Sequence, residues 1–260
     1  MSNLHGTFVW YELMTTDMKA AEDFYRGVIG WAARDSGVPD VSYTLFTMGE
    51  RPVGGVMMLP ESAREAGARP GWLGYVAVED VDASAAKVME AGGTVHRAPG
   101  DIPGVGRFAF VGDPQGAVFA LFRGIGEAPP PVAPGTPGHA GWHELYAADW
   151  PTTFNFYAAL FGWVKADAID MGPMGTYQLI ARGGEGGGSA FGGMMTKPDT
   201  VPVPFWNYYF NVEAIDSAVV RVIAGGGQII NGPYQVPGGS WIIQGLDPQG
   251  AMFSLVAPRR

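Results

Sequence analysis

An internal duplication is the feature that most constrains the fold of this chain, because both copies must build the same structure. The segment Trp10–Leu13 returns as Trp142–Leu145, and Asp113–Ala117 returns as Asp247–Ala251. The residue numbers of the two copies differ by 132 at the first match and by 134 at the last. An insertion of that small size fits in a loop. The 260 residues are therefore predicted to form two tandem copies of one domain.

Proline marks the junction between the copies. Residues 126–138 contain prolines at positions 129, 130, 131, 134 and 137, a composition typical of a stiff, extended linker. We therefore expect a first domain at residues 1–125, a linker at 126–138 and a second domain at 139–260.

Within each copy, one order of elements is expected twice. The residue patterns predict strands and helices in the order βαβββ, with a first strand over 8–14 and a helix capped by Asp17. The second of these modules is expected to start with a strand over 72–78 and a helix over 82–91, with Met89 among its inward residues. Such modules predict an α+β fold.

Composition limits the classes of partner. The chain carries 25 acidic and 16 basic residues, a net charge of -9, so it has no basic field for nucleic acid or an anionic membrane. It contains no cysteine, which removes disulfides and thiolate sites and suits a reducing compartment. No signal peptide or run of about 18 apolar residues is visible. We expect a cytoplasmic protein whose partner is a small molecule.

The paired modules, an Asp seven residues before Phe-Tyr and a late Asp-Pro-x-Gly turn make the chain resemble the vicinal oxygen chelate superfamily. That superfamily contains glyoxalase I, extradiol dioxygenases and bleomycin-resistance proteins. The chain looks closest to its two-domain, glyoxalase-like branch, which includes a mycobacterial antigen. The resemblance implies two tandem glyoxalase-like domains, each a pair of βαβββ modules forming a curved mixed sheet around a small-molecule cup.

In metal-using members, the resemblance implies metal ligands on four strands of each cup. The corresponding positions here are Trp10, Leu73 and Ala120 in the first copy and Trp142, Asn207 and Ser254 in the second, with a fourth within 53–59 or 190–196. A divalent cation needs several imidazole or carboxylate donors, and these positions do not supply them. We therefore predict no metal and no other cofactor.

The resemblance also assigns one face of each first strand to the cup. Because side chains alternate along a strand, Glu12 shares that face with Trp10 and Met14. In the second copy, Glu144 shares it with Trp142 and Tyr146, while His143 faces the helices as a hydrogen-bonded core residue. The two glutamates are either acceptors that tie the modules together or carboxylates that bind or deprotonate a ligand.

The strand that opens the second module adds further candidates. Tyr75 and Tyr209 occupy matching positions, and Asn207 lies two residues before Tyr209 on the same face. Each tyrosine is either an ordinary strand aromatic or a phenol beside the glutamate of its cup.

Three functions remain open. The leading hypothesis is a metal-free protein that binds an apolar or aromatic small molecule between aromatic walls, as a monomer or a homodimer. The second is a metal-independent enzyme, such as a lyase, isomerase or hydroxylase-like enzyme, with Glu12 or Glu144 as general base. The third is a metal-dependent glyoxalase or dioxygenase.

Overall fold

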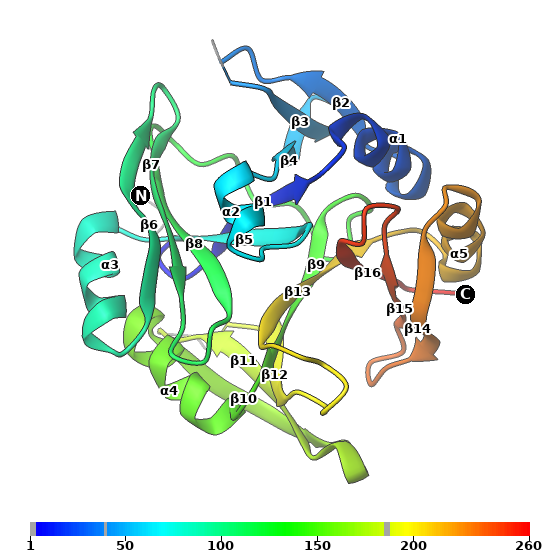
Figure 1. Cartoon of the computed structure of the whole chain (residues 1–260). Coiled ribbons are helices and arrows are strands. Elements are labelled where there is room, and N and C mark those ends of the chain that lie inside the picture. The colour runs from blue at the N-terminus through cyan, green and yellow to red at the C-terminus, as the bar shows by residue number, and fades with distance from the viewer. Residues whose placement is uncertain (1–3, 39–40, 185–187) are drawn as a thin grey trace. The chain divides into compact units, whose positions relative to one another are not determined.

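A computed structural model describes residues 4–38, 41–184 and 188–260. The first copy contains, in chain order, β1 (Phe8–Thr15), α1 (Met18–Ile29), β2 (Ala32–Asp35), β3 (Tyr43–Met48), β4 (Arg51–Met58), α2 (Glu61–Glu65), β5 (Gly71–Ala77), α3 (Val81–Glu90), β6 (Thr94–Ile102), β7 (Gly106–Gly112) and β8 (Val118–Gly124). The second copy contains β9 (Ala140–Ala147), α4 (Trp150–Phe161), β10 (Trp163–Asp170), the short helix η1 (Gly172–Met174), β11 (Thr176–Arg182), β12 (Gly192–Thr196), β13 (Phe205–Asn211), α5 (Ile215–Ala224), β14 (Gln228–Gln235), β15 (Trp241–Leu246) and β16 (Met252–Ala257). The predicted βαβββ order is confirmed in both copies (Figure 1).

Each copy forms one mixed sheet. Its strand order is β2-β3-β4-β1-β5-β8-β7-β6 in the first copy and β10-β11-β12-β9-β13-β16-β15-β14 in the second. The first strand of each module pairs in parallel with the last strand of the same module, as β1 with β4 and β5 with β8. The two opening strands therefore lie at the centre of the sheet, which confirms the predicted α+β architecture.

The helices begin and end where local chemistry directs them. The Asp17 carboxylate accepts from the backbone N–H of Ala20 and starts α1, and Gly30 ends that helix at a φ of 92°. Ala21, Phe24 and Val28 are buried on one side of α1, as their helical spacing predicts. These signals are local, so the sequence alone locates this helix.

Two compact units are distinguished by the density of their contacts. Of the described residues, one unit comprises those within 4–9, 74–130 and 143–206, and the other those within 10–73, 131–142 and 207–260. Each unit joins the second module of one copy with the first module of the other. Within the first unit α3 contacts α4, and within the second α1 contacts α5, as Figure 1 shows. The domain boundaries expected from the linker stay a prediction.

Each unit contains the same buried hydrogen-bond chain. In the first unit, Trp206 Nε1 donates to Tyr157 Oη at 2.9 Å, and that hydroxyl lies 3.1 Å from Asp113 Oδ2. In the second unit, Trp72 and Tyr25 connect to Asp247 in the same way, at 2.9 and 3.2 Å. The aspartates belong to the repeated Asp-Pro-Gln-Gly turns. These turns therefore connect the last strands of one copy to the first helix of the other.

Some sequence predictions of detail were wrong. Met89 is 62% exposed rather than inward, because α3 buries the stripe Val81, Ser84, Ala85 and Val88 and Met89 lies beside it. The βαβββ order includes the short edge strand β2, but its position was not predicted because Ala32–Asp35 has no apolar alternation. Within the described residues, no helix is long and apolar enough to span a membrane.

Candidate functional site

Glu12 lies in a buried polar cluster on β1. Its side chain is 5% exposed, and it forms a hydrogen bond with the hydroxyl of Tyr43 on β3. Trp10 Nε1 donates to the same hydroxyl at 2.8 Å. Burial raises the pKa of Tyr43 above its usual range, and the charge of Glu12 adds to this effect. The Tyr43 hydroxyl therefore stays protonated and links Trp10 to the carboxylate.

A glycine makes room for this tyrosine. Gly55 on β4 pairs with Glu12 across the sheet, and a Cβ atom at Gly55 would overlap the Tyr43 ring. The second copy has the same arrangement, since Gly193 on β12 pairs with Glu144 and a Cβ atom there would overlap the Tyr177 ring. The close approach of a tyrosine to the backbone beside each glutamate is thus a duplicated feature.

The second module of the first copy carries a face of aromatic rings, which we call the aromatic face. Tyr75 on β5 lies 6.1 Å from Phe110 and 6.0 Å from Phe122, measured between ring centroids. Phe108 lies 5.2 Å from Phe110, and the Arg97 guanidinium stands 4.5 Å from the Phe108 centroid. Tyr75 and Phe108 are buried, Phe110 and Phe122 are half-buried, and Arg97 is exposed. The face is apolar, partly open and bordered by a cation.

The matching face of the second copy is polar, and we call it the amide face. Gln244 Nε2 donates to Tyr209 Oη at 2.8 Å, and Asn231 Nδ2 donates to Gln244 Oε1 at 3.1 Å. Asn207 Nδ2 donates to Ser254 Oγ at 2.9 Å. All five side chains are neutral, and all except Asn231 are buried. Gln244 therefore stands at the position of Phe110, whereas Ile242 and Val256 stand at the positions of Phe108 and Phe122.

The remaining predicted site residues lie on the first strands. Met14 and Trp142 are half-buried. Tyr146 stacks on Phe205, with ring centroids 5.2 Å apart and an interplanar angle of 18°. The assignment of these residues to a ligand site stays a prediction.

His143 is buried and packed as a core residue. Its ring stacks on Phe8 at 4.3 Å, and Nδ1 lies 2.8 Å from the carbonyl oxygen of Phe191. Burial lowers the pKa of His143 from 6.5 to about 4, although its hydrogen bond opposes the shift. The ring is therefore neutral near neutral pH, consistent with its predicted place among core residues.

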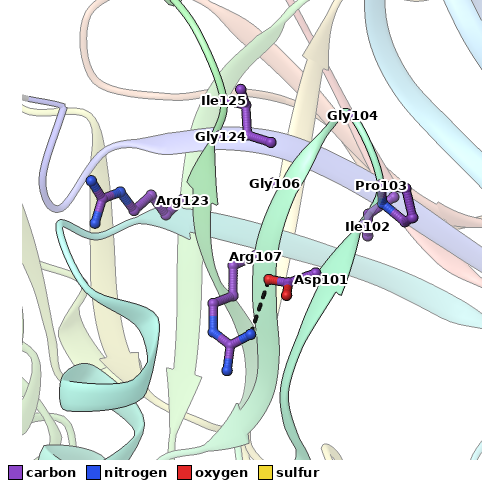
Figure 2. A pocket seen from close by; sticks show the side chains of 9 residues that line it. All are labelled: Asp101, Ile102, Pro103, Gly104, Gly106, Arg107, Arg123, Gly124 and Ile125. Atoms are coloured by element: carbon purple, nitrogen blue, oxygen red, sulfur yellow. Dashed lines mark hydrogen bonds and ion pairs between the residues drawn. The ribbon is translucent and has the colours of Figure 1, made fainter.

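A shallow pocket of about 210 Å³ lies elsewhere, at the hairpin between β6 and β7 (Figure 2). It is lined by glycines and by Ile102, Pro103 and Ile125. Arg107 at its border is held by ion pairs with Asp101 and Asp82. None of the predicted site residues lines this pocket, so it carries no part of the proposed site.

Comparison with known proteins identifies the family. The model of the Glyoxalase/Bleomycin resistance protein/Dioxygenase superfamily matches residues 7–121 and 137–255. This chain belongs to that superfamily. Two curated relatives are similar over nearly their whole length. CFP32 of Mycobacterium tuberculosis, named as a glyoxylase, is 32% identical over 255 residues, covering 97% of this chain and 95% of the relative. The anthracycline biosynthesis protein DauV of Streptomyces sp. is 33% identical over 267 residues, covering 98% and 94%.

Solved superfamily structures share the fold at low identity. The Mn(II)-bound glyoxalase from Novosphingobium aromaticivorans has a TM-score of 0.63 at 17% identity, covering 98% of this chain and 82% of that chain. Homoprotocatechuate 2,3-dioxygenase from Brevibacterium fuscum has a TM-score of 0.67 at 15% identity, covering 99% and 82%. At these identities the likeness concerns the fold alone.

The residues at the superfamily's metal positions do not fit a divalent ion. Leu73 and Ala120 offer no donor in the first copy. In the second, Asn207 and Ser254 are neutral and hydrogen-bonded to each other. In the described parts of the chain, no three His, Cys, Asp or Glu side chains gather closely enough to hold a metal. Divalent ions require such donors, so the residues at these positions do not fit one.

Sequence reasoning missed several residues of these clusters. Tyr43 and Tyr177 are 134 positions apart, as are Phe110 and Gln244. This shared offset of 134 positions can be read from the sequence, but only the pairing of the strands shows which side chains contact one another. Arg97 was missed because β6, which carries it, has no clear strand pattern.

Proposed function

We propose that this protein binds planar aromatic small molecules on its aromatic face without a metal ion. The observation that carries this proposal is the set of contacting rings Tyr75, Phe108, Phe110 and Phe122 beside Arg97. Aromatic rings attract a flat ligand by stacking and by burial of apolar surface. The guanidinium favours a ligand that also carries a negative group. Half-buried Phe110 and Phe122 keep part of the face open to solvent.

The relatives support a small-molecule role. The name of DauV places that protein in the biosynthesis of anthracyclines, and the superfamily name includes bleomycin resistance. Binding needs only a complementary face, whereas metal-dependent chemistry needs donors that are missing at the corresponding positions. We therefore favour binding over metal-dependent glyoxalase or dioxygenase activity.

Fluorescence titration with naphthoate, a flat aromatic carboxylate, tests this proposal. Phe110→Gln and Arg97→Asn each introduce the residue found at the matching position of the second copy. We expect naphthoate to bind the wild type, and Phe110→Gln to weaken binding about tenfold. Arg97→Asn should weaken it about three- to fivefold because an exposed cation contributes less.

Arg34→Asn is the matched control, because Arg34 is an exposed arginine on β2, outside the aromatic face. Its affinity should equal that of the wild type. Equal affinity of all variants, or no binding by the wild type, contradicts the proposed function.

A second candidate is a metal-independent enzyme that uses Glu12 or Glu144 as general base. The buried carboxylate of Glu12 and its hydrogen bond with Tyr43 favour it, because they form an acid–base pair. Glu12→Gln and Glu144→Gln should lower turnover of a substrate by about a hundredfold or more while the fold is kept. Unchanged turnover in both variants would remove this candidate.

A further inference from the structure

We propose that the amide face is a second ligand site, and that it takes an uncharged ring compound carrying hydroxyl or carbonyl groups. This inference extends the proposed small-molecule role to a second face and a different ligand class. It rests on the proposed function only in assuming that the sheets of this protein bind small molecules.

The duplication supplies an internal comparison for the amide face. Each of its members has a counterpart in the first copy, which lies 134 positions earlier in the sequence. The first copy has Leu73, Arg97, Phe110 and Ala120 where the second has Asn207, Asn231, Gln244 and Ser254, and Tyr75 matches Tyr209. The strand pairing agrees, since Asn231 pairs with Gln244 as Arg97 pairs with Phe110. One framework therefore presents two different chemical surfaces.

The fold does not require the polar side chains of the amide face. The first copy forms the same strand order with Leu73, Phe110 and Ala120 at the positions of Asn207, Gln244 and Ser254. Gln244 is 6% exposed and Ser254 is fully buried, so water is removed from both. Burying neutral polar groups costs free energy that hydrogen bonds only partly return. A set of three such changes on one face is explained by what the face recognises.

The hydrogen-bond pattern indicates the ligand class. A chain of donors and acceptors leads from exposed Asn231 through Gln244 to the hydroxyl of Tyr209. Amide and hydroxyl groups both donate and accept, so they match hydroxyl and carbonyl groups of a ligand. None of the five members is charged, and a buried carboxylate or ammonium group on the ligand would lack a counter-ion. The amide face therefore selects a neutral polar compound, whereas Arg97 favours an acidic one.

Two probes with the same ring separate the faces, namely naphthol, which is neutral, and naphthoate, which is anionic. Because naphthol can also stack on the aromatic face, it is titrated with naphthoate at saturation, where the wild type should still bind naphthol at a second, saturable site. Gln244→Phe and Ser254→Ala, which introduce the residues of the first copy, should weaken naphthol binding about tenfold. Naphthoate affinity should stay unchanged in both variants.

Ser254→Ala is the smaller change and keeps the test valid if Gln244→Phe does not fold, as circular dichroism and thermal unfolding would show. Arg97→Asn is the matched control, which should weaken naphthoate binding and leave the naphthol site that persists at saturating naphthoate unchanged. The proposal is overturned if the wild type does not bind naphthol, or if naphthol affinity is unchanged in Ser254→Ala. It is also overturned if saturating naphthoate abolishes naphthol binding. Failure of naphthoate binding alone contradicts the proposed function and leaves the naphthol result as a separate outcome.

Discussion

The buried histidine of the second copy predicts a specific loss of stability in mild acid. His143 packs on Phe8 and bonds to the Phe191 carbonyl, and its pKa in the folded protein is about 4 rather than 6.5. Between these values the unfolded chain binds more protons than the folded chain. The free energy of unfolding therefore rises with pH across this window. The stabilisation is complete above about pH 6.5 and is lost as the pH falls toward 4.

The magnitude follows from the two pKa values. Lowering the pH from about 7 to about 5 should cost about 2 kcal/mol from this residue alone. Urea unfolding of the wild type at several pH values, followed by tryptophan fluorescence, would measure the slope.

His143→Asn isolates the effect, because the Asn amide keeps a donor near the Phe191 carbonyl and does not titrate. The variant should be less stable at neutral pH, since it loses the stacked ring, but its stability should fall less between about pH 7 and 5. His96→Asn removes an exposed histidine and serves as the control. Parallel pH dependences of the wild type and His143→Asn would refute the reasoning.

Three further outcomes are expected. Tyr157→Phe should lower the free energy of unfolding by about 1 to 3 kcal/mol in urea, because it leaves the buried Asp113 carboxylate short of a donor; equal stability would contradict this. Gly193→Ala should destabilise by a similar amount, about 1 to 3 kcal/mol, by displacing Tyr177, while Gly27→Ala, with open space around it, should not; equal melting temperatures would refute this contrast. Metal analysis of the purified protein should find well under one divalent ion per chain, and a chelator should leave the melting temperature unchanged; a stoichiometric ion would overturn the donor argument.

Local and repeated sequence signals were enough to predict most of the fold. The capping Asp17 and the Asp-Pro-Gln-Gly turns depend only on residues close to one another in the sequence, and the duplication repeats the same pattern in both copies. Together they predicted the βαβββ order and the α+β class correctly. Alternation also placed Trp10 and Glu12 on one face of β1, where both contact the hydroxyl of Tyr43. The positions of edge strands such as β2 were missed because their residues face solvent and have no apolar period.

The sequence by itself determined that the chain is a duplicated member of its superfamily and that its metal positions lack suitable donors. Tertiary structure decided which side chains meet. The partner of Glu12 is Tyr43, more than thirty positions away, and it fits there only because Gly55 has no side chain. The difference between the aromatic and amide faces likewise arises where strands β5 to β8 and β13 to β16 pair. Sequence periodicity gives the face of one strand, whereas the register between strands follows from packing of the whole sheet.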